Sequence, residues 1–291
     1  MALDAPPNPA VKTASPSSPP PPRVLLFDLD ETLWDCMKTI RNAATKTQEQ
    51  FPFLQNFETG IKPLIEEFPE KSFDYTFLRK TYLERENPEG TSKAVVDEQF
   101  DYWHKWRNTP FFFDNVVPQL RKLQKMKEKR REARNYPLII GAVTDGNADV
   151  FQVEEVKDLF DFSVCAIEVG ACKPSEKMFQ KALEKARNCL EKQVGTGIAI
   201  AEADRQQEAQ GIIPVLQKDD EIPVLHPADC LMIGDDFAKD IVGAKQNGMQ
   251  ACWIRNAEKR AGTDMLEITP EYEFETVVEL IEKILLVLDR D

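Results

Sequence analysis

The chain has 291 residues, 42% of them hydrophobic and 30% charged. This length allows one large α/β domain, with or without a smaller companion, and the composition is that of a folded globular protein rather than a disordered or fibrous one. A formal net charge of -13 repels nucleic-acid phosphates over most of the surface, so no nucleic-acid partner is expected. No apolar run approaches the roughly 18 residues of a membrane span, so no membrane partner is expected either.

The first 22 residues are rich in proline, alanine and serine and contain no apolar block. This composition predicts a disordered tail. The segment lacks the apolar centre of a signal peptide, and a transit peptide is disfavoured by Asp4 and by the absence of arginine before Arg23. The default expectation is therefore a cytoplasmic protein.

Five short runs rich in apolar and β-branched residues follow the tail and predict buried strands. They cover residues 24–30, 138–144, 163–169, 230–235 and 250–254. Helical spacing of apolar residues between and after them predicts helices near residues 117–126, 178–186 and 277–284. The alternation predicts an α/β fold with a Rossmann-like parallel sheet and helices on both faces. In such sheets the ligand site lies beyond the carboxyl ends of the strands.

More than a hundred residues separate the first two predicted strands, far more than one crossover helix requires. Within residues 37–112, Val96, Phe100 and Trp103 follow helical spacing, which predicts an inserted α-helical cap domain with a small core of its own. Three polar residues end this segment: His104, Lys105 and Arg107. Their side chains are interpreted as exposed to solvent or as hydrogen-bonded within the core, and they are not included in the predicted site.

Residues 191–228 are polar and acidic and show little sustained periodicity. They are interpreted as an acidic surface insertion within the core domain, and the composition favours disorder.

The first strand ends in two carboxylates, Asp28 and Asp30, on the same side of the strand. Burying two acids is costly unless a cation or hydrogen-bond donors compensate, so a metal ion is the natural partner. The alternative is a strand-end turn with solvated acids.

Polar residues also end the other strands. Thr144, Asp145 and Gly146 precede an apparent helix. A hydroxyl and backbone N–H groups at a helix start suit a phosphate oxygen, although a plain N-cap turn is the alternative. Lys173 precedes Pro174 after the third strand, where a lone lysine would usually be solvated. The fourth strand ends in an acidic cluster that could also serve only to complement a helix dipole. This cluster consists of Gly234, Asp235, Asp236 and Asp240.

In this order, these pieces resemble the haloacid dehalogenase-like hydrolase superfamily. Its D-x-D-x-T motif matches Asp28, Asp30 and Thr32, and its later motifs match Thr144, Lys173 and the segment Gly234–Asp240. The resemblance covers residues 23–36 and 113–256 and implies a catalytic core of residues 23–36 and 113–291, interrupted by the cap at 37–112.

The resemblance also implies a role for each residue. Asp28 would attack phosphorus and form an aspartyl-phosphate, while Asp30 would protonate the leaving oxygen and then activate water. Thr144, with the backbone of Asp145 and Gly146, would bind the substrate phosphate together with Lys173. Magnesium (Mg²⁺) would be held by the Asp28 carboxylate, the Asp30 backbone carbonyl and Asp235. Thr32, Asp236 and Asp240 would support the site.

Two residues depart from the family pattern. Glu31 stands where glycine is frequent, and Asp145 stands where asparagine is frequent. Both add negative charge, and Asp145 does so beside the expected phosphate.

The implied function is hydrolysis of a small phosphorylated metabolite, a phosphomonoester, by a magnesium-dependent phosphatase. A phosphomutase would share the same chemistry, and a catalytically weak binding or regulatory protein is an alternative of another class. A dehalogenase is disfavoured because Asp30 is present. The substrate and the oligomeric state are left open.

Overall fold

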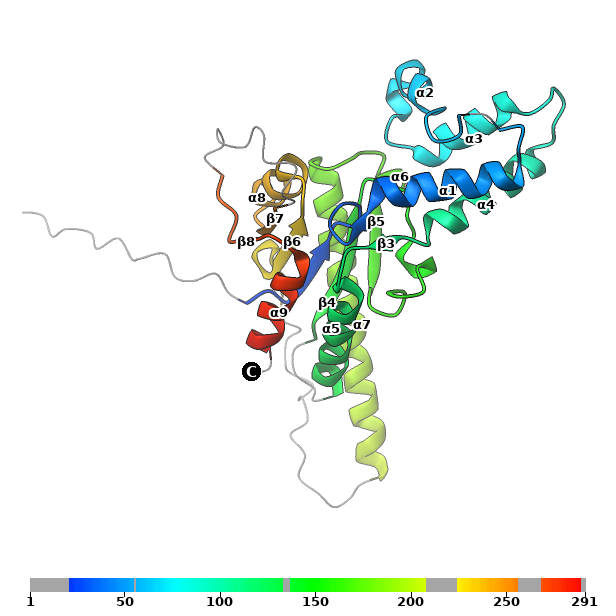
Figure 1. Ribbon diagram of the computed structural model, residues 1–291. Coiled ribbons are helices and arrows are strands. Elements are labelled where there is room, and N and C mark those ends of the chain that lie inside the picture. The colour runs from blue at the N-terminus through cyan, green and yellow to red at the C-terminus, as the bar shows by residue number, and fades with distance from the viewer. Residues whose placement is uncertain (1–20, 55, 133–136, 208–223, 256–267, 289–291) are drawn as a thin grey trace, which may run out of the picture.

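The computed structural model describes residues 21–54, 56–132, 137–207, 224–255 and 268–288 (Figure 1). The predicted disordered tail lies outside these ranges, apart from its last two residues. In the described parts of the chain, no helix is long and apolar enough to cross a membrane.

A six-stranded parallel sheet forms the centre of the molecule. Its strands are β1 (Val24–Phe27), β4 (Ile139–Thr144), β5 (Phe162–Cys165), β6 (Cys230–Gly234), β7 (Gln250–Ile254) and β8 (Tyr272–Phe274). They lie in the order β5-β4-β1-β6-β7-β8, and every neighbouring pair is parallel. The strand order reverses at β1, so the carboxyl ends of β4, β1 and β6 surround the point where such sheets bind ligands.

Helices cover both faces of the sheet, as the alternating side chains of β1 require. Leu25 and Phe27 belong to a core shared with α5 (Val116–Glu132) and α9 (Val277–Leu288). Val24 and Leu26 belong to a second core shared with α7 (Glu176–Gln207), the π-helical segment η4 (Phe237–Val242) and α8 (Gly243–Gln246). The predicted fold class is confirmed.

The third strand is shorter than predicted. β5 ends at Cys165, and residues 166–169 form the short helix α6 (Ala166–Val169), which ends at Gly170 in the left-handed conformation with φ 74°. A short apolar run does not by itself distinguish strand from helix, and here the left-handed glycine supplies a helix end. The strand β8 at the sheet edge was not predicted.

Helix α7 continues to Gln207 and projects well past the sheet in Figure 1. The first part of segment 191–228, for which little periodicity was predicted, is therefore helical. Leu225 near its end is buried in the second core, and Arg187 donates to the Leu225 carbonyl. Residues 208–223 of this segment lie outside the described residues.

Four helices between β1 and β4 form a separate group, here called the helical lobe (residues 36–107). They are α1 (Cys36–Gln50), α2 (Lys62–Glu67), α3 (Tyr75–Glu86) and α4 (Lys93–Arg107), with a short 3-10 turn η1 (Pro69–Lys71). The lobe has its own aromatic-rich core, which includes Phe57, Phe100 and Trp103. The two chain segments that join it to the sheet pair as antiparallel strands, β2 (Trp34–Asp35) and β3 (Phe111–Phe112). Figure 1 shows the lobe set apart from the sheet.

Candidate active site

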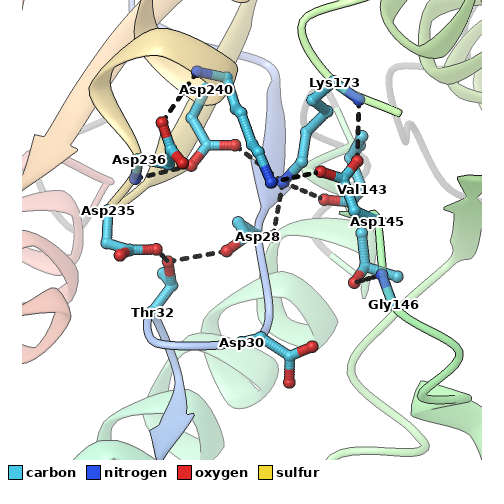
Figure 2. Close-up of polar contacts among 12 residues, drawn as sticks. Asp28, Asp30, Thr32, Val143, Asp145, Gly146, Lys173, Asp235, Asp236 and Asp240 are labelled. Atoms are coloured by element: carbon cyan, nitrogen blue, oxygen red, sulfur yellow. Dashed lines mark hydrogen bonds and ion pairs between the residues drawn. The ribbon is translucent and has the colours of Figure 1, made fainter. Parts of the chain in front are cut away.

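The polar residues predicted from the strand ends meet at one edge of the sheet. Asp28 directly follows β1, Thr144 is the last residue of β4, and Asp235 directly follows β6. Because these three strands are neighbours, their carboxyl ends bring the three side chains to one cavity, and Figure 2 shows Asp28 and Asp235 with Thr32 between them. The Asp28 N–H donates to the Ile233 carbonyl at 2.8 Å, so ladder hydrogen bonding continues to the residue that carries the first carboxylate.

Lys173 lies at the centre of this group. Its Nζ is 2.5 Å from Asp28 Oδ1 and 2.7 Å from Asp240 Oδ1, and it donates to the Val143 carbonyl at 3.0 Å. Burial alone lowers the pKa of Lys173, but Asp240 and Asp28 outweigh that effect and raise the pKa. Lys173 is therefore a buried ammonium between two acids and not a solvated lysine.

Asp235 joins the two acids that pair with Lys173 to form a cluster of three buried carboxylates. Oxygen atoms of Asp28, Asp235 and Asp240 lie within 4.8 Å of one another. Burial, followed by the neighbouring Asp240, raises the pKa of Asp28 well above its usual range, and burial raises the pKa of Asp240 to about 6. The Thr32 hydroxyl also contacts Asp28 Oδ2 at 3.2 Å and Asp235 Oδ1 at 3.4 Å.

The three carboxylates carry more negative charge than the single ammonium of Lys173 can balance. This excess decides whether the predicted metal ion fits the site. A small divalent cation with a preference for oxygen ligands compensates such an excess. The donor set therefore fits Mg²⁺, with Asp28 and Asp235 as predicted ligands and Asp240 as a third nearby carboxylate.

Asp30 lines the same cavity, but its side chain points away from Lys173 (Figure 2). Arg107 Nη2 lies 2.7 Å from both of its oxygens, and Trp34 Nε1 donates to Oδ1 at 2.7 Å. Burial raises the pKa of Asp30, but the Arg107 charge and these hydrogen bonds outweigh it, so the net pKa is lowered. The two acids of the first motif thus occupy different electrostatic environments.

The loop after β4 is a turn. Gly146 N–H donates to Thr144 Oγ1 at 3.1 Å, and the next helical element is only the 3-10 turn η2 (Val150–Gln152). The helix start predicted here is therefore wrong, because Asp149 caps a single turn that does not propagate. A Cβ on Gly146 would lie 2.8 Å from Asp30 Oδ2, so the loop backbone passes close to that acid.

Asp145, one of the two departures from the family pattern, is held by cationic and backbone partners. Its Oδ1 accepts from the Lys173 N–H at 2.8 Å, and its Oδ2 lies 3.1 Å from Lys239 Nζ. The carboxylate thus orients the Lys173 backbone and is neutralised by Lys239, which reduces its repulsion of a phosphate.

Asp236 and Asp240, which follow β6, make different contacts. Asp236 Oδ1 accepts from the N–H groups of Ala238 and Lys239, so Asp236 caps η4. Asp240 is fully buried, and its Oδ2 accepts from the Asp236 N–H at 3.1 Å. Asp240 therefore belongs to the charged cluster, whereas Asp236 shapes the turn.

A cavity of about 580 Å³ lies between this sheet edge and the helical lobe. The lobe contributes Arg107, which the sequence interpretation left outside the site. One signal could have revealed it: Arg107 follows Val96, Phe100 and Trp103 at helical spacing, which places a charged residue on the buried stripe. Its contact with Asp30, 77 residues earlier in the chain, depends on how the lobe packs against the sheet.

Comparison with known proteins agrees with this geometry. A family model described as haloacid dehalogenase-like hydrolase matches residues 22–248. The chain is 28% identical over 250 residues to 5-amino-6-(5-phospho-D-ribitylamino)uracil phosphatase YigB of Escherichia coli, covering 79% of this chain and 82% of that protein. It is 28% identical over 247 residues to glyceraldehyde 3-phosphate phosphatase of Pyrococcus furiosus, covering 80% of each.

Among solved structures, 2-haloacid dehalogenase from Pseudomonas syringae pv. Tomato DC3000 superimposes with a TM-score of 0.63 at 23% identity, covering 91% of this chain and 99% of that chain. At that identity the likeness concerns the fold. The match of the family model over most of the sequence shows that the chain belongs to the haloacid dehalogenase-like hydrolase family.

Proposed function

We propose that this hydrolase is a Mg²⁺-dependent phosphatase that cleaves a small phosphomonoester through an aspartyl-phosphate at Asp28. The supporting observation is the separation of two acids on one cavity wall. Asp28 pairs with Lys173 inside the anionic cluster, whereas Asp30 is held apart by Arg107 and Trp34. Two carboxylates in different environments can divide the nucleophilic and proton-transfer roles between them.

In the first step an Asp28 carboxylate oxygen forms a bond to phosphorus, and the bond from phosphorus to the leaving oxygen breaks. Asp30, which Arg107 keeps ionised in this structure, must first take up a proton, and it then gives that proton to the leaving oxygen, so the alcohol leaves neutral. Lys173, 2.5 Å from Asp28 Oδ1, compensates charge on the nucleophile and on the transferred group. In the second step Asp30 takes a proton from water, the water oxygen attacks phosphorus, and inorganic phosphate departs with regeneration of the Asp28 carboxylate.

The groups that would hold Mg²⁺ are the Asp28 and Asp235 carboxylates, with the Asp30 backbone carbonyl, and Asp240 lies beside them. When bound, the ion would supply positive charge that draws nucleophile and phosphate together. Thr32 orients two of these carboxylates through its hydroxyl.

The helical lobe is proposed to act as the cap that selects the substrate. It supplies the cavity wall opposite the sheet edge and places Arg107 on Asp30. Two relatives are named as phosphatases of a sugar-derived phosphate and a triose phosphate, which supports a small phosphorylated metabolite as the substrate class. The core of residues 23–36 and 113–291 would then carry the chemistry.

The test is hydrolysis of an aryl phosphate, with and without Mg²⁺, measured as released inorganic phosphate. The proposal expects Mg²⁺-dependent release to water, whereas a phosphomutase would require a phosphoryl acceptor for turnover. Inactivity on aryl phosphates and on a panel of sugar, nucleotide and small organic phosphates, across a metal and pH series, would instead favour a binding or regulatory protein.

A further inference from the structure

Three hydrogen-bond donors in the lobe's share of the cavity wall have no acceptor among the residues that the structure describes. They are Arg79 Nε, Trp103 Nε1 and Arg107 Nη1. Their side chains are nearly fully buried, with exposed fractions of 3%, 2% and 2%. Buried donors without acceptors are costly and rare, so three on one cavity wall require an explanation.

The three donors form a continuous row. Trp103 and Arg107 are four residues apart on α4 and so lie on the same face of that helix. Arg79 on α3 packs against Trp103, with its guanidinium carbon 4.8 Å from the centre of the indole ring. The row leads from Asp30, which Arg107 contacts, into the lobe.

Arg79 carries a charge that no carboxylate in the described part of the chain neutralises through an ion pair. One of its nitrogens donates to the Phe57 carbonyl, and its guanidinium carbon lies 4.7 Å from the Phe57 ring centre. Burial lowers the pKa of Arg79 to about 10, which leaves it protonated at neutral pH. Tyr82 contributes a favourable electrostatic interaction, but burial raises the pKa of its phenol to about 12, so it is neutral at neutral pH. Glu58 contributes a weaker one, but its carboxylate pairs with Arg41 at 3.2 Å.

The remaining lobe residues on the wall offer no acid. Apart from these three residues they are the apolar Met37, Ile40 and Ile61 together with Cys36 and Tyr75. A buried guanidinium without a counter-ion is destabilising, and a wall made only of donors and apolar groups attracts an anion.

We infer that Arg79 and Trp103, with Arg107 beside them, form a second anion subsite, so that the substrate of the proposed phosphatase is a phosphorylated carboxylic acid. This inference rests on the proposed function and specifies its substrate class. Arg107 already pairs with Asp30, so Arg79 contributes the one uncompensated positive charge of this subsite. A ligand group with a single negative charge, a carboxylate, matches it. The phosphate end lies at Asp28, and the carboxylate end lies in the lobe.

The experiment compares O-phosphorylated ω-hydroxy acids of increasing chain length with their primary amides, which have the same shape without the charge. The measured quantity is kcat/KM for phosphate release by the full chain with Mg²⁺. At the chain length that spans the two subsites, the acid should exceed the amide by roughly 10- to 100-fold, the range for a hydrogen bond to a charged group. The Arg79→Met variant should lose this preference, and Trp103→Phe should reduce it.

The acid-to-amide ratio is insensitive to partial misfolding, because a lower folded fraction reduces both rates equally. Arg85→Met is the matched control: Arg85 lies on the same helix, exposed and paired with Glu67, and this variant should keep the wild-type ratio. Phosphate release without any preference for the acids, or a preference that Arg79→Met retains, would overturn the subsite and leave the phosphatase intact. Failure to hydrolyse every phosphomonoester tested would overturn both.

Discussion

Trp34 shows how one buried side chain can set the position of a proposed proton-transfer group. Its ring is fully buried and packs edge-on against Phe112, with 5.4 Å between ring centres, and its Nε1 donates to Asp30 at 2.7 Å. The indole thus anchors Asp30 to the base of the connection between sheet and lobe. Arg107 holds the same carboxylate from the lobe side.

Replacing Trp34 by Phe should therefore lower kcat by about tenfold while changing KM little, because a hydrogen bond to a charged group is lost but no substrate contact is. Steady-state kinetics checks this, with thermal melting to establish that the variant is folded. Trp106→Phe is the control, since Trp106 Nε1 has no hydrogen-bond partner among the described residues. A rise in KM with unchanged kcat would argue against a positioning role for Trp34.

Asp28, Thr144 and Asp235 could be predicted because each lies at the end of a strand, and strands are visible in the local sequence. Arg107, which orients Asp30, could not, because it reaches Asp30 only after the lobe has packed against the sheet. The sequence identified Glu31 as a departure from the family pattern but not the backbone conformation behind it. Glu31 adopts a left-handed conformation with φ 62°, which explains why the family often has glycine there. Its side chain accepts from the Cys36 N–H at 3.1 Å, an interaction that glycine lacks.

Among the elements, the end of segment 191–228 differs most from the sequence interpretation. Composition predicted a surface segment throughout, because the average polarity of the segment is high and hides a single buried leucine. The structure nevertheless places Leu225 in the core under the sheet, where Arg187 on α7 binds its carbonyl. Replacing the whole of 191–228 by a short linker would therefore remove core contacts as well as surface chain.

Leu225→Ala should destabilise the protein by about 2–4 kcal/mol, the usual cost of truncating a buried leucine. Val224→Ala is the matched control, because Val224 is adjacent but 67% exposed and should change stability by less than about 0.5 kcal/mol. Chemical denaturation measures both values. Equal effects at the two positions would place Leu225 outside the core.

At the scale of the molecule, a parallel sheet and a helical lobe enclose one anionic cavity between them. The parallel sheet with helices on both faces follows from alternating strand and helix patterns, and the lobe from the long insertion after β1. How closely the lobe approaches the sheet is not encoded locally, because the contacts that fix it, such as His104 to the Asn147 carbonyl at 2.7 Å, join distant segments. If the lobe selects the substrate, as proposed above, that selection depends on those contacts.

The charge imbalance of this cavity predicts a strict requirement for a divalent cation. Activity should vanish in excess chelator, return with Mg²⁺ and fail with Ca²⁺, whose larger and looser coordination would misplace the nucleophile. Binding should also raise the melting temperature by a few degrees. Asp235→Asn should remove most of this thermal shift. Full activity in chelator would contradict the metal assignment.

Asp28 as the nucleophile is the central assignment of the proposed mechanism, and mass spectrometry of rapidly quenched protein tests it directly. Asp30→Asn keeps the nucleophile but loses the proton transfer that usually contributes roughly 10² to 10⁴-fold. With an activated aryl phosphate it should accumulate a phosphate adduct on the peptide containing Asp28, because water attack is no longer assisted. Asp28→Asn should show no adduct and no turnover. An adduct in Asp28→Asn, or turnover by it at the wild-type rate, would contradict the mechanism.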